Sequence, residues 1–388
     1  MNRKAMKPNL TNRTYQTNKI MKTKTSLMAT AATIALLGAA HGQTVIDITG
    51  STAGRSAVVN RVKALLVGEN AAWVGSASET SANRQIYYGG TYNGLPVTVR
   101  LFWSGSAAGV RDVSNAPQLG ASYIVSNYSG PTGQNNGASL ASASAETVSE
   151  IGFSDVFQSS TSFTTNALTD EVNVAVIPFV FMKNDGAAAG ITNITPPMFQ
   201  ALFGSLGESP LSLFTGNAAD SGHTVFLTGR NNESGTRITT VANNYYGLNL
   251  NGNQFEGAGD PLTLTYVGNG GYSSGSGVAA VLGATITGAR SVVGYLGTSD
   301  GTTAATGGAS YLKFNGFDYS PAAVYNGQYT QWGYLHQFTM LDINGTGLTE
   351  TFYKGLRDAM IANPGSGTLS LDLMNVERAA DGAVVLPK

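Results

Sequence analysis

The segment from Gly229 to Arg237 reads Gly-Arg-Asn-Asn-Glu-Ser-Gly-Thr-Arg and joins a predicted strand to a predicted helix. The β-branched and aromatic residues 224–228 before it are typical of a short buried strand. Residues 238–246 after it carry apolar side chains at helical spacing. Residues 234–236 therefore fall in the first turn of the helix, where backbone N–H groups have no partner inside the helix.

The chemistry of this turn suits an anion. Free N–H groups and the positive end of the helix dipole attract negative charge. Ser234 and Thr236 add hydroxyl donors, and Gly235 allows a ligand to approach the backbone closely. Arg230 supplies a planar guanidinium that can donate two parallel hydrogen bonds to an oxyanion. These residues alone leave a simpler interpretation open, in which Ser234 caps the helix and Arg230 lies on the surface.

The composition is that of an exported protein rich in loops. The chain has 388 residues, which is enough for two domains of ordinary size. Few residues are charged while Gly, Ser, Thr and Asn are plentiful, which argues against a nucleic-acid-binding protein. The absence of cysteine excludes disulfides, thiolate metal sites and a cysteine nucleophile. The histidines His41, His223 and His336 are isolated from one another, so we expect neither a metal site nor a cofactor.

Charge is distributed unevenly along the chain. Residues 1–42 hold 7 basic residues and no acidic one. Without them, 15 basic residues (22 less 7) face 23 acidic ones, a net charge of −8. Because an acidic protein does not attract anions over a distance, any anion site must consist of local, directed donors.

Residues 1–42 are predicted to be a secretory signal peptide with an upstream extension. Lys22 and Lys24 precede an apolar run of small residues, and small residues at Ala40 and Gly42 precede Gln43. No other stretch is apolar enough to cross a membrane. We therefore expect a soluble, monomeric mature chain located in the periplasm or outside the cell.

Three further turns rich in Ser, Thr and Gly also follow predicted strands. Each turn, with its preceding strand in parentheses, lies at 49–56 (45–48), 104–110 (97–103) and 154–155 (151–153). In open α/β sheets, ligands bind beyond the carboxyl ends of the strands. The four turns are therefore expected to converge on one ligand.

Strands and helices alternate through the rest of the chain, which predicts α/β architecture. Residues 172–182 are nearly continuously apolar and suit a buried parallel strand bent at Pro178. Residues 126–147 are predicted to be a surface excursion, and residues 247–277 a hairpin or loop. Further helices are predicted at 58–66, 194–203 and 349–361, and further strands at the end of 283–296 and at 337–341.

These motifs resemble those of type II periplasmic solute-binding proteins, specifically the phosphate-binding receptors of ABC transporters. Residues 230–236 are similar to the Arg-x-x-x-Ser-Gly-Thr anion loop of that family, and residues 151–155 to its Phe-Gly-Ala-Ser-Asp segment. Residues 103–109 resemble its Gly-Ser-Ser-Gly-Gly turn, and residues 49–54 its Thr-Gly-Ala-Gly-Ala-Thr start. Each motif is short, and the family order over nearly the whole mature chain makes the match specific.

The resemblance implies an α/β protein with the two-lobed periplasmic-binding-protein type II fold, a hinge and a ligand cleft between the lobes. With crossovers near Pro178 and Thr330, lobe one is 43–177 plus 331–388, and lobe two is 178–330. The implied function is non-enzymatic capture of inorganic phosphate or a similar oxyanion, with an ABC transporter permease as partner. The implied ligand-binding residues are Ala53, Gly54, Arg55, Ser106 and Asp155 from lobe one, and Arg230, Ser234, Gly235 and Thr236 from lobe two.

Asp155 is expected to select the anion. A carboxylate repels an anion unless the anion carries a proton that it can donate. Hydrogen phosphate carries one at neutral pH and sulfate does not, so an acceptor-only group favours phosphate over its isostere. The alternative is that Ser154 and Asp155 merely cap a helix.

The chain departs from the family pattern at four positions. Asn232 stands where phosphate receptors often carry an Asp beside the arginine, and Glu233 replaces a small residue. Arg55 stands where an aromatic or apolar residue is usual, and Ala107 replaces Ser or Thr. These departures bear on the identity of the anion more than on the fold.

Two other functions are compatible with parts of the sequence. An exported hydrolase would use Ser106 or Ser234 as nucleophile and His223 or His336 as base, although neither serine has a Gly-x-Ser-x-Gly frame. A surface or matrix protein that kept the lobes but lost transport would account for the Gly-, Asn- and Ser-rich insertions.

Overall fold

The computed structural model describes residues 43–116, 119–135, 148–248 and 250–388. The predicted signal peptide at 1–42 and most of the predicted surface excursion, residues 136–147, lie outside the described residues. Residues Thr44–Lys388 form one compact unit. Among the residues described, none of the helices has the length and apolar character needed to cross a membrane.

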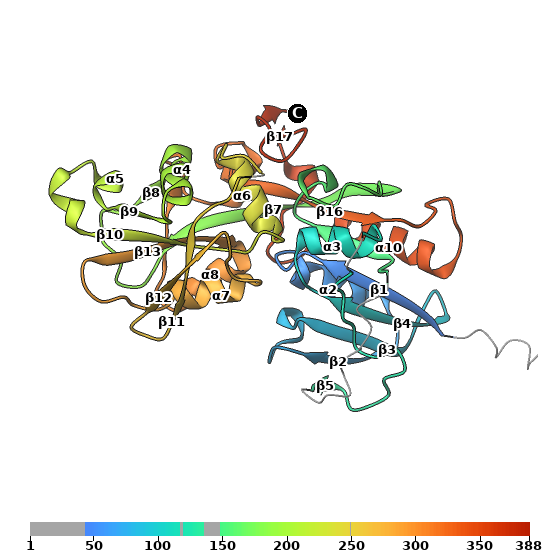
Figure 1. Ribbon diagram of the computed structural model, residues 1–388. Coiled ribbons are helices and arrows are strands. Elements are labelled where there is room, and N and C mark those ends of the chain that lie inside the picture. Colours follow the sequence, from blue (N-terminus) through green and yellow to red (C-terminus); the bar gives the residue numbers. More distant parts are fainter. Residues whose placement is uncertain (1–42, 117–118, 136–147, 249) are drawn as a thin grey trace, which may run out of the picture. The chain divides into compact units, whose positions relative to one another are not determined.

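A mixed sheet of 12 strands organises this unit (Figure 1). In spatial order its strands are β5 (Gly133–Gln134), β2 (Asn70–Val74), β3 (Arg84–Tyr92), β4 (Leu95–Phe102), β1 (Thr44–Gly50), β6 (Ile151–Ser154), β16 (Trp332–Thr339), β7 (Asp170–Lys183), β13 (Arg290–Gly297), β10 (Thr224–Thr228) and β9 (Glu208–Pro210), with β14 (Ser310–Tyr311) paired to β7. Three two-stranded sheets complete the strands: β11 (Gln254–Ala258) with β12 (Thr263–Gly268), β15 (Lys313–Phe314) with β8 (Asn193–Ile194), and β17 (Val376–Glu377) with β18 (Leu386–Pro387).

Helices cover the sheet and follow several of its strands. They are α2 (Arg55–Leu65), α3 (Ser106–Val113), α4 (Pro196–Gly204), α5 (Ser212–Thr215), α6 (Gly235–Asn243), α7 (Gly275–Leu282), α8 (Thr298–Thr306), α9 (Pro321–Tyr325) and α10 (Leu348–Ala362). Short 3₁₀ turns lie at Glu79–Ser81, Gln158–Ser160, Ala218–Gly222 and Leu371–Leu373. The predicted strand–turn–helix order is therefore present at β1–α2, β4–α3 and β10–α6.

The strands β4, β1 and β6 run parallel to one another, with β1 in the middle. Ile48 pairs with Leu101 on one side and with Ile151 on the other. Because parallel strands end at the same edge of a sheet, the turns after these three strands meet there. Apolar side chains of β1, β4 and β6 pack with one face of α2 and with α10 in a single buried cluster.

The strands β10 and β13 form a second parallel pair, and Phe226 lies opposite Val292. Their side chains belong to two other buried clusters, which include residues of α4 on one face and of α7 and α8 on the other. The strand predicted at 224–228 is confirmed, and the strand predicted at the end of 283–296 is confirmed as β13. Neither α7 nor α8 was predicted from the sequence.

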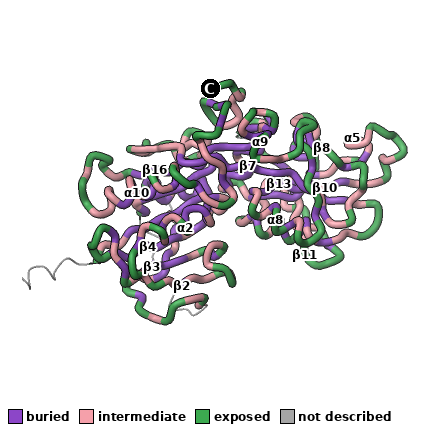
Figure 2. The backbone as a smooth tube through the Cα atoms, turned by 180° about the vertical axis from the view of Figure 1, so that it is seen from behind, coloured by how far each residue is buried: buried purple, intermediate pink, exposed green. Residues whose placement is uncertain are grey.

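The prediction of a parallel strand at 172–182 is wrong in its direction. β7 is antiparallel to β16, to β13 and to β14. A continuous apolar run indicates that a strand is buried on both faces, and β7 is buried in this way from Val174 to Met182. Because a strand can be buried on both faces in either direction, the run does not determine the direction of the strand. β7 pairs with β16 as far as Pro178 and with β13 from Phe179 onward, so Pro178 marks the change of partner. Figure 2 shows both β7 and β16 buried along most of their length.

Several other predicted elements are confirmed with shifts of boundary. α4 begins with Pro196 after the cap residue Thr195, and α10 ends shortly before Pro364. The Gly-rich segment 247–277 contains the hairpin of β11 and β12. The strand predicted at 337–341 begins earlier, at Trp332, and ends at Thr339.

Candidate functional site

The turn after β1 is connected to Asp155 through one hydroxyl. The Oγ of Ser51 accepts hydrogen bonds from the N–H groups of Ala53 at 3.1 Å and Gly54 at 3.0 Å. The same hydroxyl donates to the Asp155 carboxylate. This connection holds the turn, which opens α2, beside the end of β6.

Asp155 is buried where the ends of β4 and β6 meet. Its N–H donates to the Oγ of Ser106, the first residue of α3, at 3.0 Å. Both residues are 1% exposed. Burial raises the pKa of Asp155 to about 6, while the hydrogen bond from Ser51 and the charge of Arg230 oppose the rise. Because Ser51 holds the carboxylate and no α-helix starts at Asp155, the helix-cap interpretation is wrong.

Arg230 is buried and held by backbone carbonyls. Its Nε donates to the carbonyl of Tyr272 at 3.1 Å, and its Nη2 donates to the carbonyl of Ser273 at 2.8 Å. Nη2 also donates to the hydroxyl of Thr52 at 3.1 Å, which links α6 and its turn to the turn after β1. Arg230 is 1% exposed, so the interpretation that it lies on the surface is wrong. Burial lowers its pKa, and the negative charges of Asp300 and Asp155 raise it.

The first turn of α6 lies directly against Ser106 and Asp155. A Cβ atom added at Gly235 would overlap the Ser106 side chain and lie 2.8 Å from the Cβ of Asp155. Ser234 caps the helix, since its Oγ accepts from the N–H of Arg237 at 3.4 Å. In the described part of the chain, the N–H groups of Gly235 and Thr236 have no hydrogen-bond acceptor. Both residues are buried, Gly235 against Ser106 and Asp155, so these N–H groups keep unused hydrogen-bonding capacity at the first turn of the helix.

Arg55 differs from the other predicted site residues. Its side chain does not join the network around Asp155 but lines a neighbouring cavity together with Asp300. Its Nη1 donates to the Asn83 side chain at 3.3 Å. Burial lowers the pKa of Arg55, the charge of Asp300 raises it, and the charge of Arg230 lowers it. Thus Ala53, Gly54, Ser106 and Asp155 are brought together with residues 230–236, while the guanidinium of Arg55 points elsewhere.

Three residues at this site, Ser51, Thr52 and Asp300, are not predicted from the sequence. Ser51 and Thr52 lie inside the quoted turn at 49–56, and their hydroxyls could have marked them as hydrogen-bonding groups. Asp300 is in the first turn of α8 and has no local signal. Its charge acts on both Arg230 and Arg55, so it supplies the carboxylate that Asn232 does not.

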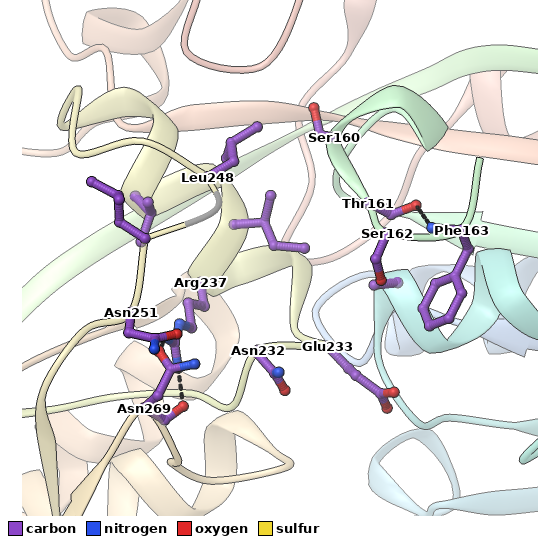
Figure 3. Close-up of a pocket in the computed structure, with 14 residues that line it drawn as sticks. Ser160, Thr161, Ser162, Phe163, Asn232, Glu233, Arg237, Leu248, Asn251 and Asn269 are labelled. Carbon is purple, nitrogen blue, oxygen red and sulfur yellow. Dashed lines mark hydrogen bonds between the residues drawn. The ribbon is translucent and has the colours of Figure 1, made fainter.

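Glu233, which replaces a small residue of the family pattern, joins the turn before α6 to α3. Its carboxylate accepts from Nη1 of Arg111 at 2.8 Å, and its carbonyl accepts from the N–H of Ala107 at 3.1 Å. Figure 3 shows the Glu233 side chain extending from its loop toward the helix. The side chains of Arg111 and Glu233 are 13% and 38% exposed, so solvent screens this ion pair in part.

Replacing Glu233 with glutamine is expected to lower the free energy of unfolding by less than about 1 kcal/mol, because a partly exposed ion pair contributes little. The loss should disappear in 1 M salt, where the screening length is about 3 Å. Urea unfolding at low and high salt measures this difference. Glu377→Gln is the matched control, since Glu377 is exposed and has no ion pair among the described residues. An equal loss of unfolding free energy in the control, or a loss that persists in high salt, would contradict a stabilising ion pair between Arg111 and Glu233.

The pocket drawn in Figure 3 does not suit an anion. It has a volume of about 250 Å³ and lies between residues 160–163 and residues 232–251. Its cationic side chain, Arg237, donates to the carbonyls of Asn269 at 2.7 Å and Gly270 at 3.2 Å, as Arg230 donates to those of Tyr272 and Ser273. The carboxylate of Glu233 adds a negative charge to the lining. We therefore place the candidate site at Arg230 and not in this pocket.

The two serines considered as nucleophiles have no histidine partner among the described residues. The Oγ of Ser106 accepts from the N–H of Asp155, and that of Ser234 accepts from the N–H of Arg237. His223 lies 2.8 Å from the Oγ of Ser291 instead. His336 is fully buried, and burial lowers its pKa to about 3. The arrangement required of a serine hydrolase is thus not present in the described residues.

No known family model matches this sequence, and no curated protein matches it in sequence. Solved structures do match its fold. One is a protein from Clostridium perfringens assigned as a phosphate ABC transporter substrate-binding protein and solved with bound phosphate, with a TM-score of 0.50 and 14% identity over 84% of this chain and 100% of the other. An ABC-type phosphate transport receptor from Vibrio cholerae matches with a TM-score of 0.44 and 12% identity, over 84% of this chain and 99% of the receptor. PstS from Borrelia burgdorferi matches with a TM-score of 0.41 and 13% identity, over 84% of this chain and 99% of PstS.

The first of these likenesses establishes the fold alone, because only 14% of the residues are identical. This chain has the α/β fold of the two-lobed periplasmic binding proteins, as the sequence motifs predict. What it binds has to be argued from its own residues.

Proposed function

We propose that this protein is an exported solute-binding protein that captures an oxyanion, most simply inorganic phosphate, for an ABC transporter. The single observation that carries the proposal is the buried guanidinium of Arg230, whose Nη1 donates to the hydroxyl of Thr236 at 3.5 Å. The N–H groups of Gly235 and Thr236 beside it have no acceptor among the described residues. A buried cation next to directed N–H donors is a favourable environment for an anion.

The charges around Arg230 favour an anion that also carries a proton. Asp155 faces Gly235 across the contact between the first turn of α6 and the end of β6. The positive charge of Arg230 lowers the pKa of Asp155, so the two charges interact. When ionised, its carboxylate is an acceptor only, so it favours hydrogen phosphate over an anion without a proton. Asp300 offsets part of the positive charge of Arg230 when the site is empty.

In this proposal the lobes are 43–177 plus 331–388 and 178–330, connected by β7 and β16. The close contact of Gly235 with Ser106 supports an opening motion, because an anion can reach the N–H groups only when the two surfaces separate. Closure of two lobes around a ligand is a known kind of hinge motion. The proposed contacts then come from Ser106, Asp155 and the turn at 53–55 on one side, and from Arg230, Ser234, Gly235 and Thr236 on the other.

The competing proposal of a surface or matrix protein rests partly on the Gly-, Asn- and Ser-rich insertions. One of them, residues 247–277, also builds the candidate site. Its backbone carbonyls at Tyr272 and Ser273 hold Arg230, and those at Asn269 and Gly270 hold Arg237. This insertion therefore has a role in positioning the guanidinium, which favours the binding protein over the alternative.

Phosphate is expected to stabilise residues 43–388 by about 2.7 kcal/mol at 100 times its dissociation constant, since it binds only the folded state. Thermal unfolding in a panel of oxyanions at constant ionic strength measures this shift. Chloride at the same ionic strength is the control for general salt effects. A cooperatively unfolding protein that no oxyanion stabilises would favour the surface-protein alternative.

A further inference from the structure

A polar cavity lies next to Arg230 and shares only the turn at 53–55 with the proposed oxyanion contacts. It has a volume of about 180 Å³ and is lined by the start of α2, the 3₁₀ turn at Glu79–Ser81, the start of α8 and residues 366–367. It is thus bounded by segments from both sides of the contact between Gly235 and Ser106. A small molecule held there would touch both lobes of the proposed receptor.

Hydroxyl groups dominate the lining of this cavity. On one side they belong to Thr52, Ser56, Thr80, Ser81 and Ser366, and on the other to Thr298, Ser299 and Thr303. A hydroxyl can donate and accept, and those of Thr298 and Thr303 already donate to the carbonyls of Gly367 and Ser299, so these two can accept from a ligand. Such a lining suits a ligand that carries several hydroxyl groups of its own.

Two charged groups add specificity to the lining. Arg55 is 7% exposed, and its one hydrogen bond in the described residues uses Nη1. Its Nε and Nη2 remain available to a ligand. Asp300 can accept hydrogen bonds from ligand hydroxyls. A buried arginine with free donors in a hydroxyl-lined cavity is a more specific feature than the cavity alone.

The cavity and the oxyanion site share Thr52. The hydroxyl of Thr52 lines the cavity and accepts from Nη2 of Arg230 at 3.1 Å. Ala53, whose N–H is held by Ser51, also lines it. Thr52 therefore joins the guanidinium of Arg230 to the wall of the cavity.

We propose that the cavity receives the organic part of a phosphate monoester, so that the ligand is the phosphate of a small polyol. The inference rests on the proposed oxyanion-binding function and adds the class of ligand. An engineered cavity of about 150 Å³ holds benzene, which has six heavy atoms. Beyond its phosphate group, glycerol 3-phosphate has about five heavy atoms, which is below that number, and its two hydroxyls match the polar lining. The phosphate lies at Arg230, and the glycerol hydroxyls bind Arg55, Asp300 and the surrounding hydroxyls.

Two neighbouring threonines of α8 provide a matched test. Thr303 lines the cavity and Thr302 does not. Both are exposed, and each donates its hydroxyl to a helix carbonyl, Thr302 to Thr298 at 3.1 Å and Thr303 to Ser299 at 3.4 Å. Calorimetric titration with sn-glycerol 3-phosphate and with inorganic phosphate compares the parent chain with Thr303→Phe and Thr302→Phe.

We expect Thr303→Phe to weaken glycerol 3-phosphate binding at least tenfold and to leave phosphate binding within twofold. Thr302→Phe should change neither. If the parent binds phosphate but not glycerol 3-phosphate, or if Thr303→Phe binds both as the parent does, the ester proposal fails and the oxyanion site stands. If the parent binds neither, the proposed function fails.

Discussion

Replacing Arg230 with alanine is expected to weaken phosphate binding by one to four orders of magnitude. The change removes a charge-assisted donor and leaves a buried anion poorly compensated, which costs roughly 2–5 kcal/mol in comparable buried charge pairs. At about 1.4 kcal/mol for each tenfold change, this cost gives the stated range. Calorimetric titration with phosphate at fixed ionic strength measures it.

Two further variants make this result specific. Arg230→Lys keeps the charge but loses the planar pair of donors, so it should recover only part of the affinity. Arg290→Ala removes a partly exposed arginine that binds Thr287 in its own turn, and should bind phosphate as the parent does. Because Arg230 also holds the carbonyls of Tyr272 and Ser273, its loss should lower stability too. Unchanged phosphate affinity in a folded Arg230→Ala variant would place the site elsewhere.

Replacing Asp155 with asparagine is expected to weaken phosphate and to strengthen sulfate relative to phosphate. The amide can donate a hydrogen bond where the carboxylate can only accept one, so the repulsion of an unprotonated oxygen is removed. Titration of both anions into parent and variant gives the ratio of their affinities. A ratio that does not change would mean that Asp155 does not sense the proton on the anion.

The same residue predicts a pH dependence. Burial raises the pKa of Asp155 to about 6, so the carboxyl is mainly ionised at pH 7 and mainly protonated at pH 5. The protonated carboxyl can donate to sulfate. Discrimination against sulfate should therefore fall as the pH drops through about 6 in the parent, and it should change less in Asp155→Asn, where only the phosphate itself titrates. A parent whose discrimination is constant from pH 5 to pH 8 would contradict the assigned role.

The sequence predicts the parts of the site that depend on local pattern. The strand at 224–228, the helix after it and the turns after β1, β4 and β6 follow from apolar spacing, from Gly and from hydroxyl residues. The expectation that these turns meet follows from the common edge of parallel strands, and the contact between Asp155 and Ser106 agrees with it. Site residues that lie close in sequence to the end of a strand can therefore be predicted from the sequence.

The parts that depend on distant contacts could not be predicted. Asp300 acts on Arg230 from a helix that no apolar pattern indicated. The direction of the Arg55 side chain depends on Asn83 and on the cavity around it, and the role of Glu233 depends on Arg111 in another helix. The antiparallel direction of β7 depends on its partners, whereas its apolar run reports only burial.

A crystal structure of residues 43–388 grown with phosphate tests the central claim most directly. We predict one phosphate group whose oxygens lie about 2.7–3.2 Å from the guanidinium of Arg230 and the N–H groups of Gly235 and Thr236, which is hydrogen-bonding distance. One oxygen should face Asp155 and another Ser106. Phosphate bound only at other positions, with Arg230 still bonded only to carbonyl and hydroxyl groups of the protein, would contradict the claim.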